Sequence, residues 1–417
     1  MKPKVLFIDP IDKGYRNFLR LNNKFNENGY ETLLVHATSF SHPIKDKEYI
    51  VNDLLIRDIS YYDTKLFRKV IEKEAPSIIL IINLSFILDR AIVNIAKRKN
   101  IKIVYLAHGS LTNPIEFDKA RDDLDKEIKD NVKRIFSKKN FFGLLNYIDS
   151  KKIGVKSISF FKLMMGIVKH PAQYLTLAKF DKELDVDLLL VYENKDKILL
   201  SEKMNFPANK IKVVENPEIS EFVNLPVLEK KPFLASIGMS DIRYAVYLDD
   251  GLVANKIWTD DEWYSHLISI AHILKGQQIL LIVKLHPRMD LSLHEEFFLE
   301  YKDSIIPVMD IDFKNLLYHA SFVISHYSST VIYALLFNKK VIIPKWDENS
   351  RKLSNKYPED VVKYSYNLCD IENETQEKTS NDRNVNINKF LENMGINVTV
   401  NSIDLVIKEI IGLVDLD

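Results

Sequence analysis

The chain has 417 residues, of which 46% are hydrophobic and 28% charged, and its 58 basic residues balance 58 acidic ones. This length predicts two domains, and the composition is typical of a globular protein rather than a disordered or fibrous one. A net charge of zero gives no global sign of a nucleic-acid-binding protein. The single cysteine excludes an intramolecular disulfide and a cysteine-based zinc site.

No apolar run reaches the 18 residues that a transmembrane helix requires. The first residues run directly into a predicted strand, which is not the pattern of a signal peptide. We therefore expect a cytoplasmic protein, and peripheral contact with the inner face of the cell membrane remains compatible with that expectation.

Short apolar runs alternate with longer segments of helical spacing, which predicts an α/β protein with parallel sheets and crossover helices. Continuous β-branched runs indicate strands that are covered on both faces. The predicted strands of the first half lie at residues 4–9, 31–36, 77–83, 101–106, 187–192 and 211–216. Those of the second half lie at residues 243–248, 278–285, 304–309, 321–325 and 340–344.

Residues 216–233 contain three prolines and a charge cluster, which is typical of a linker. We expect two Rossmann-like domains that face a cleft, an N-terminal one at residues 1–220 and a C-terminal one at residues 230–400. The last segment, residues 401–417, has helical apolar spacing, and our hypothesis is that it packs back on the N-terminal domain.

Residues 118–180 show helical spacing without a strand and predict a helical insertion in the N-terminal domain. The first part of this insertion is highly charged, whereas the second part interleaves Phe, Leu and Met with Lys. Two interpretations stay open for the apolar side chains. They form the core of a helical subdomain, or they contact a membrane surface or an acceptor.

Residues that follow the predicted strands are the candidates for a site, because open parallel sheets bind ligands beyond the carboxyl ends of their strands. In the first half these residues are Asp9, His36, Asn83 with Ser85, His108 with Gly109, and Glu193 with Asn194. In the second half they are Asp249 with Asp250 and Gly251, His286 with Pro287, Asp310, Ser325 with His326, and Trp346 with Asp347.

His286 ends the apolar stretch "ILLIVKLHPRMD" and is held by the following Pro287. At the end of a buried strand, its imidazole would donate a hydrogen bond or a positive charge to a phosphate. Lys284 and Arg288 would add to the positive field. The alternative is a structural histidine bonded to a nearby carbonyl group.

Ser328, Ser329 and Thr330 lie where a short strand gives way to an apolar helix that is predicted to end near Asn338. Hydroxyl and free N–H groups at a helix N-terminus form an anion site, although simple N-capping explains one serine equally well. Because these residues and His286 follow strands of one sheet, the sequence predicts a pocket for a nucleotide phosphate.

Asp249 and Asp250 follow the first strand of the second half, and Gly251 permits a tight turn after them. Paired carboxylates that face a cleft act as a general base or bind sugar hydroxyls, whereas a surface D-D-G turn is the bland alternative. His108, after a strand of the first domain, is a second candidate base for an acceptor hydroxyl.

Several enzyme classes lack their motifs here. No G-x-G-x-x-G follows the first strand, and the chain has no P-loop and no G-x-S-x-G elbow. No D-x-D triplet stands in a loop position typical of metal-dependent transferases, so we expect no metal site. The 11 glycines fit a site that binds phosphate with side chains and helix ends.

The stretches "VKLHPR" and "SHYSST" resemble the HP and serine motifs of bacterial sialyl- and polysialyltransferases. They are also similar to those of capsule-type Kdo transferases and of CDP-glycerol polymerases. These enzymes have the GT-B fold of two Rossmann-like domains. The resemblance implies that His286, Ser328 and Ser329 bind the phosphate of a cytidine nucleotide donor.

Two weaker stretches extend the resemblance. "YLDDG" is similar to the acidic motif of sialyltransferases, which implies that Asp249 or Asp250 is the base, although here the motif lies in the second domain. "AHGS" resembles the H-G element of the CDP-glycerol and capsule enzymes, which implies the same role for His108.

These observations predict a glycosyltransferase that needs no cofactor or metal and transfers a CMP-activated acidic sugar, a nonulosonic acid such as sialic or pseudaminic acid, or Kdo. The expected acceptor is a bacterial surface oligo- or polysaccharide, including lipid-linked forms, and no nucleic-acid partner is expected. Three alternatives stay open: a CDP-glycerol or UDP-sugar transferase of the same fold, a nucleotide-sugar epimerase, and a non-catalytic glycan-binding protein.

Overall fold

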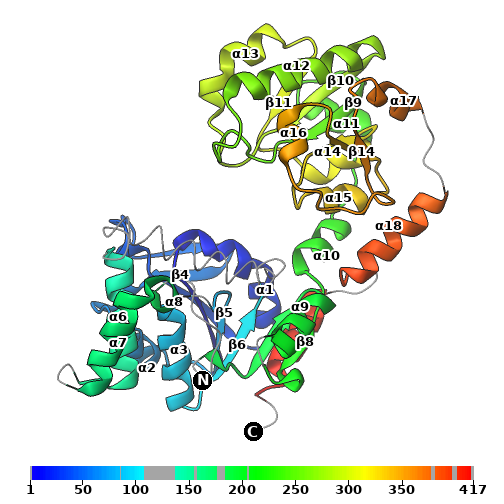
Figure 1. Ribbon diagram of the computed structural model, residues 1–417. Coiled ribbons are helices and arrows are strands. Elements are labelled where there is room, and N and C mark those ends of the chain that lie inside the picture. The colour runs from blue at the N-terminus through cyan, green and yellow to red at the C-terminus, as the bar shows by residue number, and fades with distance from the viewer. Residues whose placement is uncertain are drawn as a thin grey trace. The chain divides into compact units, whose positions relative to one another are not determined.

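The computed structural model describes residues 2–84, 86–107, 137–154, 157–175, 184–203, 206–376, 381–396 and 402–414. The chain divides into two compact units (Figure 1). The first unit comprises Met1–Ser220 and Met394–Asp417, and the second comprises Glu221–Asn393. Among the described residues, no helix is both long enough and apolar enough to cross a bilayer.

The first unit is built around one sheet of eight strands in the order β3-β4-β2-β1-β5-β6-β7-β8. All neighbouring strands pair in parallel except β3 and β4. The strands are β1 (Lys4–Asp9), β2 (Glu31–His36), β3 (Glu48–Val51), β4 (Leu54–Asp58), β5 (Ile78–Ile81), β6 (Lys102–Leu106), β7 (Leu188–Val191) and β8 (Ile211–Val213).

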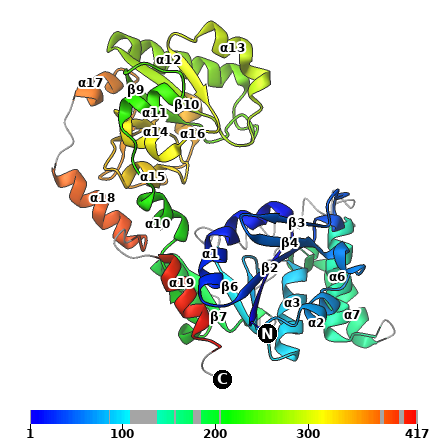
Figure 2. The ribbon, with the colours of Figure 1, turned by 180° about the vertical axis from the view of Figure 1, so that it is seen from behind.

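Helices cover both faces of this sheet, which explains why its strands are apolar throughout. The helices are α1 (Tyr15–Glu27), α2 (Phe67–Glu74), α3 (Ile87–Arg98), α6 (Lys138–Lys151), α7 (Ile158–Lys169), α8 (Pro171–Leu175), α9 (Asn194–Ile198) and α19 (Ser402–Ile411). One face packs against α2 and α3, and the other against α1 and α19 (Figure 2). The last helix therefore completes the core of the first unit.

The helical insertion is confirmed over its described residues, where α6, α7 and α8 lie between β6 and β7 along the chain. α6 packs along α3, and side chains of all three insertion helices form a small apolar cluster with α3. Part of the insertion is therefore an ordinary helical core, as the first of the two interpretations proposed.

The β3–β4 hairpin was not predicted from the sequence. Asn52 and Asp53 form its two-residue turn with φ values of 44° and 63°. Positive φ at both central positions is the requirement of a type I′ hairpin turn, which Asn and Asp tolerate better than most residues. The hairpin places an antiparallel strand at the edge of an otherwise parallel sheet.

The second unit has a six-stranded parallel sheet in the order β11-β10-β9-β12-β13-β14. Its strands are β9 (Arg243–Leu248), β10 (Ile279–Lys284), β11 (Ile305–Val308), β12 (Val323–Ile324), β13 (Val341–Pro344) and β14 (Lys363–Ser365). β10 and β11 lie on one side of β9, and β12, β13 and β14 lie on the other. This is the strand order of a Rossmann sheet. The predicted Rossmann-like architecture is therefore confirmed.

The helices of the second unit begin where a linker was predicted. They are α10 (Pro217–Asn224), which crosses the boundary between the units, α11 (Lys230–Ser236), α12 (Asp260–Gly276), α13 (Glu295–Glu300), α14 (Phe313–His319), α15 (Val331–Leu335), α16 (Glu348–Lys352), α17 (Asp370–Gln376) and α18 (Asn381–Asn393). The boundary between the units, at Ser220 and Glu221, falls within the linker predicted at residues 216–233. The first part of this linker is helical, because Pro217 occupies the first position of α10, where proline is well tolerated.

Candidate functional site

The strand pairing of the second unit brings several predicted residues to one edge of its sheet. β9 pairs with β10 so that Leu248 lies opposite Lys284, and with β12 so that Tyr247 lies opposite Ile324. The direction of the strand order changes between β9 and β12, which is where such sheets bind ligands. The residues just beyond these strands are Asp249, Asp250, His286, Ser325 and His326.

Asp249 holds the loop that carries His286. One carboxylate oxygen accepts the N–H of Gly251 and the other accepts the N–H of His286, each at 3.0 Å. Burial raises the pKa of Asp249, against the lowering effect of these two donors. Gly251 has φ +69°, and a Cβ atom there would lie only 3.0 Å from Cγ of the His286 ring. The D-D-G motif therefore sits directly beneath the HP histidine.

Asp250 holds the neighbouring loop, which carries Ser325 and His326, in the same way. Its carboxylate accepts the N–H of His326 at 2.7 Å and the hydroxyl of Ser325 at 3.3 Å. Burial raises the pKa of Asp250 to about 6, and the charge of Asp249 adds to this increase. Asp249 and Asp250 are only 6% and 7% exposed, and both carboxylates accept backbone N–H groups.

His286 is half-buried and presents a neutral hydrogen-bond donor. Its Nδ1 accepts the N–H of Arg288 at 3.2 Å, which assigns the proton of the neutral ring to Nε2. Burial, together with the nearby charge of Arg288, lowers the pKa of His286 below its ordinary value. At neutral pH the imidazole is thus an uncharged Nε2–H donor at the carboxyl edge of the sheet.

Two basic side chains accompany His286. Lys284 is partly buried, and its ammonium group donates to the carbonyl of Leu285 at 3.0 Å, while burial lowers its pKa. Arg288 and Pro287 are exposed. Lys284 and Arg288 therefore lie next to His286 in the chain at the end of β10, and their role as a phosphate site stays a prediction.

The serine stretch forms a turn ahead of a very short helix. Ser328 Oγ lies 2.7 Å from the hydroxyl of Thr330 and also accepts the Thr330 N–H at 3.2 Å, while Ser329 is exposed. The helix that follows, α15, has five residues, and turns continue from it to Asn338, whose φ of 52° lies close to the predicted helix end. Hydroxyl groups rather than a helix dipole are therefore what this stretch offers to an anion.

Sequence reasoning did not find a cavity of the second unit. It measures about 380 Å³ and lies between α12 and the loops after β13 and β14. No lysine or arginine is among the described residues that line it. The lining residues are Trp258, Asp261, Glu262, Ser265, His266, Ser269, Trp346, Asp347, Asn349 and Leu368.

Buried aromatic rings form one wall of this cavity. His266 stacks on Trp346 with ring centroids 5.3 Å apart, and its Nδ1 lies 3.3 Å from a carboxylate oxygen of Asp347. Burial opposes the ionisation of Asp347, but His266 and the N–H of Ser350 hold the pKa of its carboxyl below its usual range. Within the described structure, Nε2 of His266 and Nε1 of Trp258 are buried without a hydrogen-bond partner.

Two residues that line this cavity, Trp346 and Asp347, were among the candidates from the sequence. Trp346 and Asp347 were noted because they follow a predicted strand, but nothing connected them with the stretch "WTDDEWYSH" of residues 258–266. Only the tertiary packing of α12 brings the two stretches together. Two tryptophans beside closely spaced acids were the signal available.

We expect buried His326 to make the fold sensitive to acid. Burial lowers the pKa of His326 well below its ordinary value, and the nearby His266 adds to this effect. The unfolded chain then binds more protons than the folded one, so stability falls as the pH decreases below about 6.5, by up to about 1.4 kcal/mol per pH unit. Urea unfolding at pH 7.5, 6.5 and 5.5 measures this slope.

The matched comparison is His326→Gln, with His272→Gln as the control at an exposed position. The raised pKa of Asp250 makes stability change with pH in the opposite direction. Because both proteins contain Asp250, the difference in unfolding free energy between wild type and His326→Gln reports the contribution of His326. Identical pH slopes for the two proteins would contradict the expectation.

Other predicted residues stand outside this arrangement. The candidate base His108, together with Gly109 and Ser85, lies outside the described residues. Asp9 follows β1 in the first unit and accepts the N–H of Ile11 at 2.9 Å. Within the described residues, no group of three or more His, Cys, Asp or Glu side chains is placed to hold a metal ion.

No protein-family model and no curated protein matches the sequence. The structure is similar to the UDP-N-acetylglucosamine 2-epimerase of Methanocaldococcus jannaschii, with TM-score 0.51, 12% identity and coverage of 99% of this chain and 100% of that chain. MnaA of S. aureus, in a co-structure with UDP, gives TM-score 0.54, 11% identity and coverage of 100% and 98%. A variant of the wall teichoic acid polymerase TagF gives TM-score 0.51, 12% identity and coverage of 99% and 90%.

These similarities extend over nearly the whole of each chain and confirm the predicted fold class, the two-domain α/β architecture known as GT-B. At such low sequence identity the likeness concerns the fold. The activity has to be argued from the site itself.

Proposed function

We propose that the protein is an enzyme that binds a UDP-sugar and transfers its sugar to a glycan acceptor. The observation that carries this proposal is the neutral Nε2–H of His286 at the carboxyl edge of a Rossmann sheet, with Lys284 and Arg288 beside it. A fixed donor within a positive field suits the phosphate of a nucleotide. The hydroxyls of Ser328 and Ser329 would complete that contact.

UDP replaces CMP in this proposal for two reasons. MnaA, which is similar over its whole length, is described with UDP, and the epimerase from M. jannaschii is named for a UDP-sugar. In addition, Asp261, Glu262 and Asp347 line the cavity of the second unit. Like charges repel, so this cavity disfavours an acidic sugar and favours an uncharged ring such as a nucleoside or neutral sugar.

The proposed reaction replaces one bond with another. An acceptor hydroxyl oxygen attacks the anomeric carbon, the bond from that carbon to the phosphate oxygen breaks, and UDP leaves. Nε2–H of His286 and the serine hydroxyls donate to the departing phosphate. His108 remains the proposed acceptor of the hydroxyl proton. We assign Asp249 and Asp250 to positioning, because their carboxylates already hold backbone N–H groups.

The second candidate is a UDP-sugar epimerase. The similarity to the M. jannaschii enzyme, which spans 99% of this chain, favours it. It would act on the UDP-sugar alone and return a UDP-sugar of altered stereochemistry, whereas the transferase consumes the donor and releases UDP.

Product analysis separates these candidates. We expect purified protein to release UDP from a panel of neutral UDP-sugars in the presence of glycan acceptors, and His286→Ala to slow that release by about 10²–10³-fold. Formation of an epimeric UDP-sugar without an acceptor would support the epimerase instead. Turnover of CMP-activated acidic sugars, with no turnover of any UDP-sugar, would contradict both.

A further inference from the structure

Helix α7 of the insertion exposes a row of large apolar side chains. Ile158, Phe161, Met165 and Val168 are 76%, 67%, 41% and 73% exposed. With 3.6 residues per turn, these four positions fall within roughly 80° of one another around the helix axis. They form one continuous apolar stripe, which we call the α7 stripe, and an exposed patch of this kind marks an interaction surface.

The other side of α7 is already packed. Leu163 is buried, and Met164 and Ile167 pack with it in a cluster that includes Tyr147 and Leu175. The α7 stripe is therefore additional to the side chains that fix the helix, and burying it is not needed to hold the helix in place. Its exposure needs a separate explanation.

The charged residues of α7 itself are of one sign. α7 contains no acidic residue, and its two lysines, Lys162 and Lys169, are exposed along the border of the stripe. Residues 137–170 contain seven lysines against a single acid, Asp149, which gives a net charge of +6 with histidine neutral. Asp149 is paired with Arg68 at 2.9 Å.

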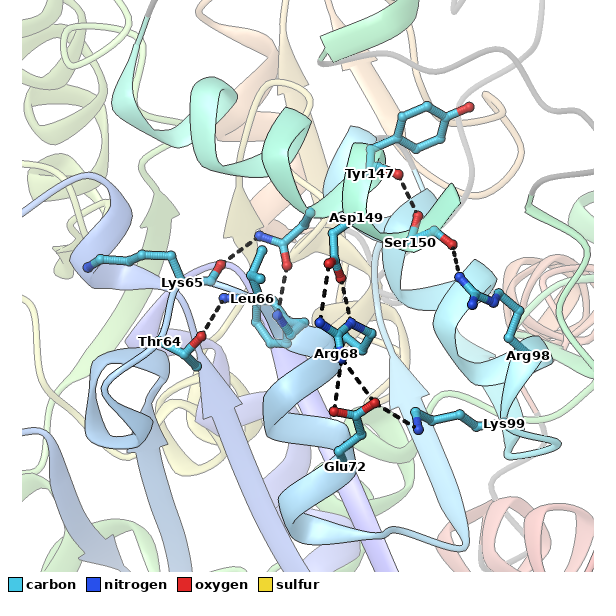
Figure 3. A network of polar contacts seen from close by, with 12 residues as sticks. Thr64, Lys65, Leu66, Arg68, Glu72, Arg98, Lys99, Tyr147, Asp149 and Ser150 are labelled. Carbon is cyan, nitrogen blue, oxygen red and sulfur yellow. Dashed lines mark hydrogen bonds and ion pairs between the residues drawn. The ribbon is translucent and has the colours of Figure 1, made fainter. Parts of the chain in front are cut away.

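Helix α6, which packs in the same apolar cluster as α7, is fixed to the first unit by hydrogen bonds. The side chain of Asn146 in α6 accepts the N–H of Phe67 at 2.7 Å and donates to the carbonyl of Lys65 at 2.8 Å. The guanidinium of Arg98 donates to the carbonyl of Ser150 at 2.6 Å. Figure 3 shows the contacts of Arg68 in α2 with Asp149 and of Arg98 in α3 with Ser150, which join both helices to α6. A surface held in this way docks without a large cost in ordering.

We propose that the α7 stripe docks on an anionic membrane surface, with its apolar side chains at the boundary of headgroups and acyl chains and its lysines against the lipid phosphates. Short helices with an apolar stripe, a basic border and no acids bind lipid interfaces in this manner. Charge complementarity selects the anionic bilayer over a neutral surface. The inference does not depend on the identity of the nucleotide.

Vesicle flotation with the full chain tests this proposal. We expect co-flotation with vesicles of phosphatidylcholine and phosphatidylglycerol, much weaker binding to pure phosphatidylcholine, and a decrease at 0.5 M salt because surface charges are then screened. The double variant Phe161→Asp with Val168→Asp should lose at least tenfold in vesicle binding. Lys162→Glu with Lys169→Glu should also lose tenfold or more, since each lysine near an anionic surface contributes about fivefold.

The matched control is Leu299→Asp, since Leu299 is 68% exposed on helix α13 of the second unit. It should bind vesicles as wild type does, and all variants should keep the wild-type melting temperature. Equal vesicle binding by the stripe variants and wild type would overturn the proposal. Absence of vesicle binding, together with a protein oligomer that the stripe variants dissociate, would overturn it too and identify the stripe as a contact between proteins.

Discussion

Replacing His286 by alanine is expected to reduce turnover of the nucleotide sugar by about 10²–10³-fold, because one fixed donor to a departing oxyanion contributes that much. Binding of UDP should weaken by about 10- to 100-fold, as expected for a lost hydrogen bond to a charged group. Steady-state kinetics and calorimetric titration of UDP measure the two effects. The fold should persist, since within the described part of the chain the ring of His286 accepts one hydrogen bond, from the N–H of the exposed Arg288.

The control for this variant is His272→Ala, because His272 is exposed on helix α12, away from the end of β10 in the chain. It should leave turnover, UDP binding and melting temperature unchanged. Full turnover by His286→Ala would show that the imidazole is structural and would remove the phosphate site from this part of the sheet.

Removing the Asp249 carboxylate is expected to destabilise the second unit as well as to reduce activity. Asp249→Ala leaves the N–H groups of Gly251 and His286 buried without an acceptor, at roughly 1–3 kcal/mol for each. Asp249→Asn should also lose stability, because its amide group presents N–H to one of these donors. Urea unfolding and kinetics on the same protein samples measure both losses.

A catalytic base behaves differently from a positioning residue. If Asp249 were the base, turnover by Asp249→Asn should fall by far more than its loss of unfolding free energy explains. Asp250→Asn serves as the parallel test for the loop of His326, and Asp303→Asn, at an exposed position, is the neutral control. Inactive but fully stable variants would restore the acid motif as the source of the base.

The sequence predicts the buried strands of both sheets well, for a simple physical reason. Strands covered on both faces must be apolar throughout, so β1, β9 and β10 stand out from the polar segments around them. β14 has three residues and the β3 strand is only partly buried, so neither leaves such a run. The helix α10 was missed because Pro217 was taken as a breaker rather than as a first helical residue.

The residues of the candidate site were predictable only where they directly follow a predicted strand. His286 and the D-D-G stretch were found because they follow strands, but the contact between Asp249 and the His286 N–H depends on strand register. The acidic cavity depends on the packing of α12 against the loops after β13 and β14, and no local pattern specifies that. The motifs alone therefore favoured an acidic sugar, and the acidic lining of the cavity became visible only in the structure.

The most direct measurement of the central proposal is the thermal stability of the protein with UDP, UMP, CDP and CMP, for wild type and His286→Ala. A ligand at one hundred times its dissociation constant stabilises the folded state by about 2.7 kcal/mol. The proposed site predicts that UDP raises the melting temperature of wild type more than CMP does, and that the increase falls to about half or less in His286→Ala at the same UDP concentration. A larger effect of CMP, an equal increase in the variant, or no increase with any nucleotide would contradict it.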